Sequence, residues 1–313
     1  MSASDEILGV VGPSGAGKTA LAMRIAEVIG GEIVSCDSMQ IYRQFDIGSA
    51  KPTADEQRRV PHHLIDVAAP DEAFSAARYA QLADQAIGEI RARGRRVIVV
   101  GGTGLYLRAL RFGLFDAPGR DDVVRTRLRN EEHERPGILH LKLRAADPQS
   151  AAKIAPRDLV RLIRALEVFE LTGTPISAHH AAHDRLPRHA MRVMVLDPAE
   201  SELVARISAR AEVMLSSGLV DETRRISGEL GRELRPLSSV GYGQVMDYLR
   251  GTLSAEKLAP AIAMATRKYA KRQRTWFRKE PGAVHYADAS ALFAGAMVQM
   301  RYIESRTAEN RRE

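Results

Sequence analysis

A glycine-rich stretch near the start of the chain has the spacing of a phosphate-binding loop. Residues 12–19 read GPSGAGKT, which matches the pattern G-x-x-x-x-G-K-[ST]. We expect the backbone N–H groups of residues 14–18 to point at phosphate oxygens. Lys18 would neutralise the outer phosphate, and the Thr19 hydroxyl would help to hold Mg²⁺. The expected phosphate-binding residues are Gly12, Pro13, Ser14, Gly15, Ala16, Gly17, Lys18 and Thr19.

The segments around this loop predict an α/β fold. "EILGVVG" precedes the loop as an apolar strand, and "KTALAMRIAEVIGG" follows it with helical spacing. Apolar runs at 32–38 and 95–106 predict two further strands, and a helix is expected at about 75–93. Strands that alternate with helices favour a phosphate-loop-type parallel sheet flanked by helices. Because ligands bind beyond the carboxyl ends of such strands, the three strand ends are expected to face one crevice.

Two polar residues stand at the ends of the second and third strands. Asp37 has three interpretations: a Mg²⁺ ligand, a general base facing the phosphate, or a cap of the following turn. Thr103 lies in the glycine turn "GGTG", which lacks the spacing of a dinucleotide fingerprint. This turn fits either a close approach of a ligand to the backbone or a plain turn.

Basic residues outnumber acidic ones in the chain and gather on two predicted helix faces. The formal net charge is +7, which suggests an acidic partner such as nucleic acid. Helical spacing aligns one set, Arg267, Lys271, Arg274 and Arg278, interleaved with Tyr269, Trp276 and Phe277. It aligns a second set, Arg157, Arg161 and Arg164. Each face fits either contact with a phosphate backbone or a solvated surface whose aromatic residues pack in the core.

Composition and patterning also predict the domain organisation. The chain has 313 residues, of which 45% are hydrophobic and 27% charged, as in soluble globular proteins. We expect an α/β core at 1–117 and 191–290, an inserted helical domain at 118–190, and a C-terminal helix with a frayed tail at 291–313. The single cysteine excludes a disulfide framework. With no signal peptide or membrane span recognised, a cytoplasmic location is expected.

Seven segments in order resemble the tRNA dimethylallyltransferase (tRNA isopentenyltransferase) family. They are GPSGAGKT, DSMQIYRQFDIGSAKPT, VPHHLIDV, GGTGLYLRAL, DLVRLIRALEVFELTG, SVGYGQ and AKRQRTWFRK, and they extend from Gly12 to about Pro281. The resemblance implies transfer of a dimethylallyl group from dimethylallyl diphosphate to an adenosine amine beside the anticodon of tRNA. It therefore favours a prenyl diphosphate in the phosphate loop and Mg²⁺ as the cofactor.

The resemblance also implies roles for individual residues. Asp37 would accept the amine proton, Thr103 would lie near the reacting centre, and Arg224 would hold the leaving diphosphate alongside Lys18. The tRNA contacts implied by the family are Asp37, Ser38, Met39, Gln40, Thr103, Arg125, Val160, Arg161, Leu162, Ile163, Arg164, Ser238, Ser239, Val240, Gly241, Tyr242, Gly243, Lys271, Arg272, Gln273, Arg274, Thr275, Trp276, Phe277 and Arg278. The chain departs from the family pattern at Gly243, where arginine is common.

Two other functions remain open at this level. A small-molecule kinase with a phosphate loop would use Asp37 as the base for an acceptor hydroxyl, and an RNA-binding module would keep a regulatory nucleotide site. The kinase leaves the basic helices without a role, and the module leaves Lys18, Asp37 and Thr103 without one. We expect a monomer that contacts tRNA and no membrane.

Overall fold

The computed structural model describes residues 6–115, 118–183 and 186–309, and it divides into two compact units. Unit 1 comprises residues 1–111 and 187–313, and unit 2 comprises residues 112–186. Residues 310–313, the end of the expected frayed tail, lie outside the described residues. No helix among the described residues is long and apolar enough to cross a membrane.

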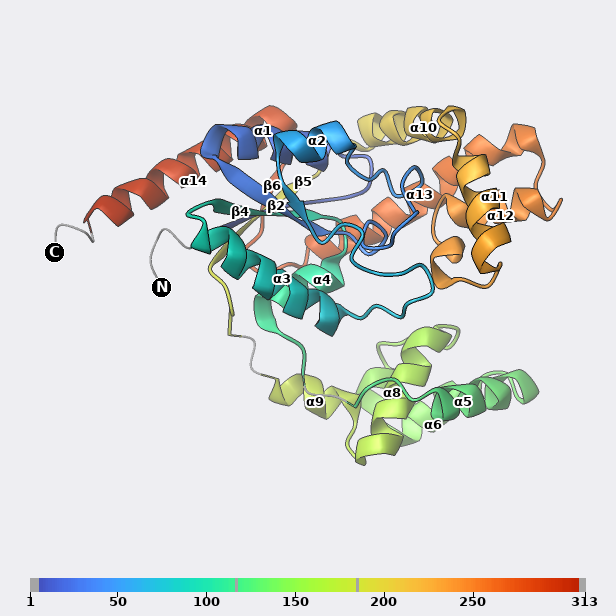
Figure 1. Cartoon of the computed structure of the whole chain (residues 1–313). Coiled ribbons are helices and arrows are strands. Elements are labelled where there is room, and N and C mark those ends of the chain that lie inside the picture. Colours follow the sequence, from blue (N-terminus) through green and yellow to red (C-terminus); the bar gives the residue numbers. More distant parts are fainter. Residues whose placement is uncertain (1–5, 116–117, 184–185, 310–313) are drawn as a thin grey trace. The chain divides into compact units, whose positions relative to one another are not determined.

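Unit 1 is built on a six-stranded parallel sheet (Figure 1). Its strands are β1 (Ile7–Val11), β2 (Gly31–Cys36), β3 (His62–His63), β4 (Arg96–Gly101), β5 (Met191–Leu196) and β6 (Val284–Tyr286). They lie in the order β3-β2-β4-β1-β5-β6, and every pair is parallel. The expected parallel sheet is therefore confirmed. Strand β3 was not predicted, because two residues are too few to show a strand pattern in the sequence.

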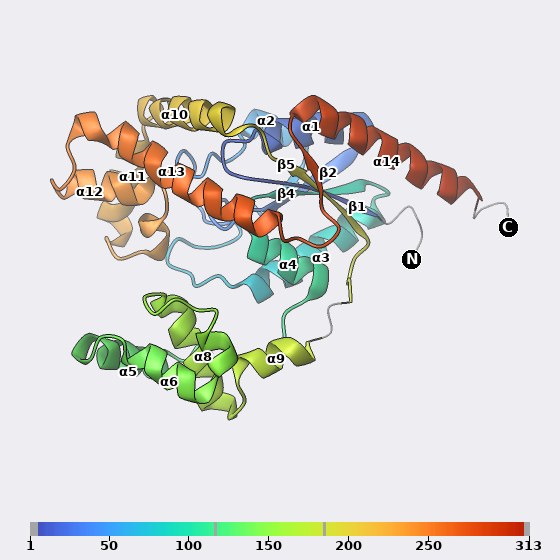
Figure 2. The same cartoon turned by 180° about the vertical axis from the view of Figure 1, so that it is seen from behind.

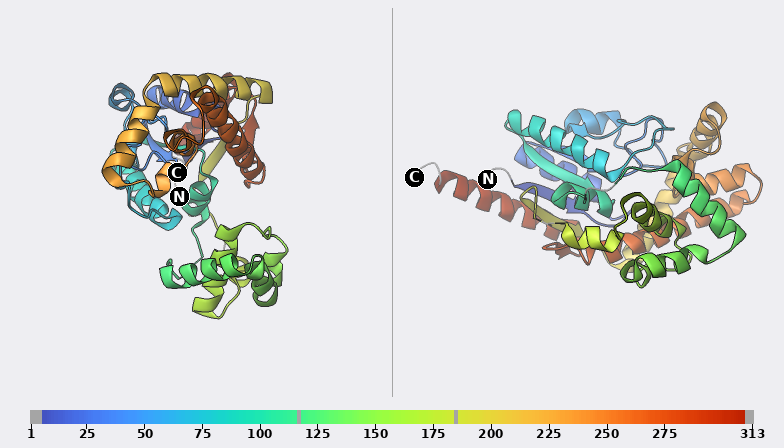
Figure 3. Two further views of the ribbon diagram at one scale, coloured as in Figure 1. Left: turned by 90° about the vertical axis from the view of Figure 1, so that its right-hand side faces the viewer. Right: turned by 90° about the horizontal axis from the view of Figure 1, so that it is seen from below.

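Helices cover both faces of this sheet. The helices of unit 1 are α1 (Lys18–Ile29), α2 (Ala54–Arg59), α3 (Ala76–Ala92), α4 (Gly104–Phe112), α10 (Glu200–Ser216), α11 (Leu219–Leu230), α12 (Tyr242–Leu249), α13 (Ala255–Phe277) and α14 (Ala289–Glu309), with a 3₁₀ turn, η2 (Arg235–Ser238). Helices α1 and α14 lie on one face, and α3 and α4 on the other (Figures 1 and 3). Helices α10–α13 gather beyond the carboxyl ends of the strands (Figure 2).

Unit 2 is wholly helical over its described residues. Its helices are α5 (Asp122–Glu134), α6 (Ile138–Ala146), α7 (Pro148–Ala151), α8 (Leu159–Thr172) and α9 (Ile176–Ala182). It has its own apolar core, formed by Leu128, Leu139, Leu143, Ala151, Leu162, Ile163, Ala165 and Leu166. A separate core accounts for the composition change that the sequence shows after Phe115.

The aromatic residues near the end of α13 pack inward. Phe277 is 1% exposed and belongs to the core of unit 1. Trp276 packs against the same core, and the Arg108 guanidinium lies 4.5 Å from the centroid of its ring. The burial of Phe277 contradicts a contact of its ring with tRNA, whereas the contact expected of the half-buried Trp276 stays a prediction.

We predict that Phe277→Ala lowers the free energy of unfolding by about 3–5 kcal/mol, the usual cost of removing a buried phenylalanine ring. Denaturant unfolding would measure this, with exposed Arg278→Ala as a control expected to change it by less than about 0.5 kcal/mol. Unchanged stability in Phe277→Ala would place the ring outside the core.

Candidate functional site

The phosphate loop joins β1 to the first turn of α1. Gly15 and Gly17 adopt φ values of 85° and 92°, which favour glycine. The Lys18 ammonium donates a hydrogen bond to the Pro13 carbonyl oxygen at 2.8 Å. Two N–H groups expected to face phosphate are used within the protein: Ser14 N–H donates to the Gln273 side chain, and Ala16 N–H to Pro13. Fewer backbone N–H groups are thus available to bind a phosphate than the motif predicts.

One carboxylate, Asp37, interacts with two cations beside this loop. The surrounding protein desolvates Lys18 and lowers the pKa of its ammonium to about 8; Asp37 opposes this shift and Arg210 adds to it. Burial likewise lowers the pKa of the Arg210 guanidinium, and Asp37 opposes that shift too. One carboxylate beside two cations leaves a net positive charge, which suits a site that binds an anion.

The Asp37 side chain also shapes the turn that follows β2. One carboxylate oxygen accepts from Met39 N–H at 2.8 Å and from Gln40 N–H at 3.4 Å. The Thr103 hydroxyl oxygen accepts from Ser38 N–H at 3.0 Å, which ties this turn to the glycine turn after β4. Capping and chemistry are therefore compatible for Asp37, because the capping bonds engage one of its two oxygens.

The glycine turn after β4 packs closely against β2 and α13. A Cβ atom on Gly101 would lie 2.0 Å from the Cys36 carbonyl oxygen. One on Gly102 would lie 2.2 Å from the Gln273 amide nitrogen, and one on Gly104 would lie 2.2 Å from the Trp276 ring. This answers the question that the sequence left open: these glycines are needed because the protein itself approaches the backbone.

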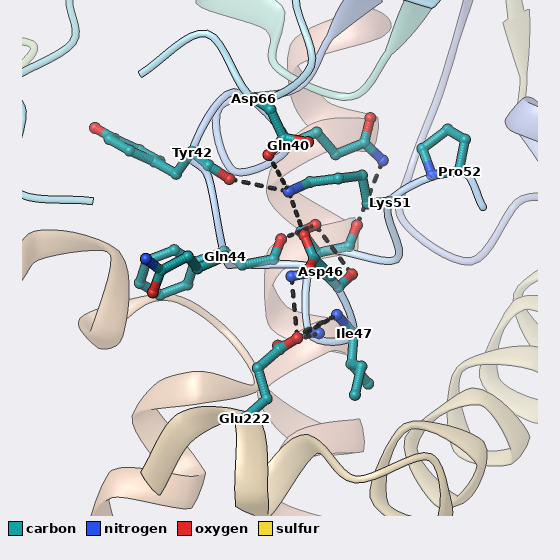
Figure 4. Close-up of polar contacts among 12 residues, drawn as sticks. Gln40, Tyr42, Gln44, Asp46, Ile47, Lys51, Pro52, Asp66 and Glu222 are labelled. Carbon is teal, nitrogen blue, oxygen red and sulfur yellow. Dashed lines mark hydrogen bonds and ion pairs between the residues drawn. The ribbon is translucent and has the colours of Figure 1, made fainter. Parts of the chain in front are cut away.

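Polar contacts from two sides hold the long loop after β2 (Figure 4). The Lys51 side chain is 5% exposed, and its ammonium contacts the Tyr42 carbonyl oxygen and the carboxylates of Asp46 and Asp66. The Glu222 carboxylate of α11 accepts from the backbone N–H groups of residues 46–48 and from the Tyr242 hydroxyl. No local pattern in the sequence indicates these long-range contacts, which hold the loop that carries Asp37.

Two cavities of about 400 Å³ each meet at this loop. The first includes the aromatic side chains of Tyr42, Phe74, Tyr106 and Tyr269 in its lining. The second is lined by Gly17, Lys18 and Thr19 of the phosphate loop, together with polar residues of the neighbouring strands. The residues common to both cavities are Ser14, Gly15, Asp37, Ser49 and Arg210. An anion in the second cavity and an apolar or planar group in the first would therefore both adjoin Asp37.

The structure contradicts the role expected of Arg224. This residue lies on α11, is 57% exposed at its side chain, pairs with Asp221 and lines neither cavity. Arg210 of α10 lies at the junction instead. In the sequence, Arg210 stands out as a cation at helical spacing from the apolar residues Ile207 and Met214. In the structure, all three line the first cavity.

Several other residues expected to contact tRNA are engaged within unit 1. The Gln40 amide bonds to Ser35 and to the carbonyls of Ser49 and Ala50. The other engaged residues are Tyr242, which is 0% exposed; Gln273, which is 5% exposed; Arg274, which pairs with Asp197; and Thr275, whose hydroxyl bonds within α13. Burial contradicts a direct RNA contact for the side chains of Tyr242 and Gln273. Contacts of Gln40, Arg274 and the exposed Thr275 with tRNA stay predictions.

The remaining expected contacts in unit 1 lie on surfaces. Ser38, Met39, Ser238, Ser239, Val240, Gly241 and Arg272 line the first cavity. Lys271 and Arg278 are exposed and, with Arg267, line a groove between α10 and α13. A Cβ on Gly243 would meet the Ser238 carbonyl oxygen at an ordinary 3.4 Å, so sterics do not explain the missing arginine there.

In unit 2, one buried carboxylate pairs with two of the arginines that were expected to contact tRNA. Glu167 is 0% exposed and pairs with Arg125 and Arg164. These hydrogen bonds outweigh its burial and lower its pKa to about 2. Val160 is 81% exposed and Arg161 is exposed, whereas Leu162 and Ile163 lie in the core of unit 2. The expected RNA contact of Leu162 and Ile163 is therefore contradicted.

Comparisons with known proteins show the family of this chain. The family model for IPP transferase matches residues 40–280. The chain belongs to the IPP transferase family. A tRNA dimethylallyltransferase from Sorangium cellulosum is 49% identical over 280 residues, covering 89% of each chain, and one from Myxococcus xanthus is 48% identical, covering 89% of this chain and 91% of its own.

Solved structures of IPP transferases have the same fold. The full-length tRNA isopentenylpyrophosphate transferase from Bacillus halodurans superposes with a TM-score of 0.71 at 34% identity, covering 98% of this chain and 99% of its own. A eukaryotic dimethylallyltransferase acting on tRNA gives a TM-score of 0.78 at 25% identity, covering 98% of this chain and 80% of its own.

The donor atoms of this IPP transferase site fit Mg²⁺ brought in with a substrate. Among the described residues, no group of three or more His, Cys, Asp or Glu side chains could hold a metal ion. Mg²⁺ commonly binds through one or two protein oxygens, substrate phosphates and water. Thr19, which lines the cavity of the phosphate loop, offers such an oxygen.

The lowered pKa of Lys18 predicts a pH dependence of diphosphate binding. Below pH 8 the ammonium is charged and affinity for a prenyl diphosphate should be independent of this group. Above pH 8 the free protein loses the proton and binding must restore it, so affinity should fall by up to about tenfold per pH unit. Isothermal titration with a non-reactive thiolodiphosphate analogue would measure this.

Lys18→Arg is the matched control, because a guanidinium stays charged throughout this range. It should remove the decline above pH 8 if it binds at all. An equal decline in both proteins would show that Lys18 does not contact the diphosphate.

Proposed function

We propose that this protein transfers the dimethylallyl group of dimethylallyl diphosphate to the exocyclic amine of the adenosine 3′-adjacent to the anticodon in tRNA, releasing diphosphate. The observation that carries this proposal is the junction of the two cavities at Asp37 and Arg210. One cavity suits a diphosphate and the other suits a planar base and a branched alkyl group. Family membership supports the same reaction.

The chemistry is a substitution at the allylic carbon. The carbon–oxygen bond to the diphosphate breaks, a carbon–nitrogen bond to the adenine amine forms, and the amine proton passes to the Asp37 carboxylate. Negative charge grows on the leaving diphosphate, where Lys18 and Arg210 would stabilise it. Aromatic walls around the first cavity limit access of water to the allylic carbon.

Mg²⁺ would be held by the Thr19 hydroxyl together with phosphate oxygens of the substrate. When bound, the ion supplies charge stabilisation to the diphosphate. The protein's own part is to place Thr19 at the start of α1, beside Lys18.

Transfer to an adenine requires that the base leave the stack of the anticodon loop. Exposed cations would hold the RNA backbone, and the candidates in unit 1 are Lys271 and Arg272 on α13 and Arg278 directly after it. Unit 2 would contribute its exposed Val160 and Arg161. We further propose that the protein is a monomer and acts in the cytoplasm, where unmodified tRNA is found.

Incubation of the protein with Mg²⁺, radiolabelled dimethylallyl diphosphate and an unmodified tRNA anticodon stem-loop tests this proposal. We expect label in the RNA and release of diphosphate, and none when the target adenosine is replaced by guanosine. Consumption of ATP with a small acceptor, or tight RNA binding without label transfer, would overturn the proposal.

The position of Arg210 predicts which arginine matters for turnover. Arg210→Gln should slow single-turnover transfer by about 100- to 1,000-fold, the usual effect of losing one group that stabilises developing charge. Arg224→Gln should stay within about twofold of the wild-type protein, because an exposed pair with Asp221 contributes little. The reverse ranking would restore Arg224 to the site and remove Arg210 from it.

A further inference from the structure

Gln273 of α13 connects the two glycine-rich loops through one side chain. Its amide oxygen accepts from Ser14 N–H in the phosphate loop at 2.8 Å. Its amide nitrogen donates to the Gly102 carbonyl oxygen, next to Thr103, at 2.9 Å. One bond requires the oxygen and the other the nitrogen, so together they fix the orientation of the amide.

The surroundings leave this side chain little freedom. Gln273 is 5% exposed, and a Cβ on Gly102 would lie 2.2 Å from its nitrogen. The backbone of this turn therefore approaches the amide closely. Thr103, one residue further on, binds Ser38 N–H and so fixes the turn that carries Asp37.

The same helix presents a different surface to solvent. Lys271, two residues before Gln273, is exposed and lines the groove beside α10. Helix α13 thus combines an outer basic face with an inner amide that contacts both loops of the site. A residue on the outer face can act on RNA affinity, whereas Gln273 can act only on the arrangement of the loops.

We propose that Gln273 is a positioning residue, which keeps the phosphate loop and the Thr103 turn in register so that the diphosphate and Asp37 are correctly placed. This inference rests on the proposed function. It differs from a tRNA contact at this position, because Gln273 is only 5% exposed and both polar atoms of its amide are bonded within the protein.

Gln273→Met tests the inference, since methionine has a similar length and neither hydrogen bond. We expect single-turnover transfer at saturating substrates to fall by about 10- to 100-fold, because displacements of about 1 Å typically cost that much. The dissociation constant for the anticodon stem-loop should stay within about twofold of the wild-type value.

Lys271→Gln should show the opposite pattern, a loss of stem-loop affinity that exceeds its loss of transfer rate at saturation. Gln299→Met is the matched control, because Gln299 lies on α14, donates a hydrogen bond to Glu6 and lines neither cavity. It should leave rate and affinity unchanged.

Gln273→Glu provides a second variant with a distinct signature. The ionised carboxylate can accept from Ser14 N–H but cannot donate to Gly102. A protonated carboxyl group can do both, and burial raises the pKa of such a group. The transfer rate of Gln273→Glu, divided by the wild-type rate at each pH, should therefore rise as pH falls.

The outcomes separate this inference from the proposed function. No transfer by the wild-type protein would defeat the proposed function itself. With active wild-type protein, three results would overturn the role of Gln273: weaker stem-loop binding at an unchanged saturating rate in Gln273→Met, a wild-type rate despite a lower melting temperature, or a flat rate ratio for Gln273→Glu.

Discussion

The whole site depends on a single carboxylate whose charge acts on two desolvated cations. Asp37 interacts electrostatically with Lys18 and Arg210, at the point where the two cavities meet. Without it, two cations would face each other in a poorly solvated site. With it, the free protein keeps both charged near neutral pH and available to a diphosphate, whose arrival leaves the carboxylate able to accept a proton.

Keeping that carboxylate in place requires contacts from elements far apart in the chain. Asp37 directly follows the carboxyl end of strand β2, and Thr103 fixes the turn in which it lies. Glu222 and Lys51 hold the remainder of the loop. Thus the parallel sheet brings the chemical groups near one another, and polar contacts from α11 and α13 set their positions more finely.

The sequence predicted the sheet and the two glycine-rich loops because local spacing encodes them: apolar runs ending in glycine turns can form little else. The place of Arg210 in an apolar helical stripe did not by itself identify it as the second cation, since only the folded arrangement brings Arg210 to the junction. The basic spacing on α13 was real, yet spacing does not reveal what a helix face packs against. Arg274 pairs with Asp197, and Phe277 is buried.

The most direct test of the central claim is the single-turnover rate of Asp37→Asn with a saturating stem-loop and dimethylallyl diphosphate. Asparagine can still accept the backbone hydrogen bonds of Met39 and Gln40, so the turn should persist. We predict unchanged stem-loop affinity and transfer slowed by about 100- to 10,000-fold, the range for a lost general base. A wild-type rate would contradict the account and leave Asp37 as a residue that only caps its turn.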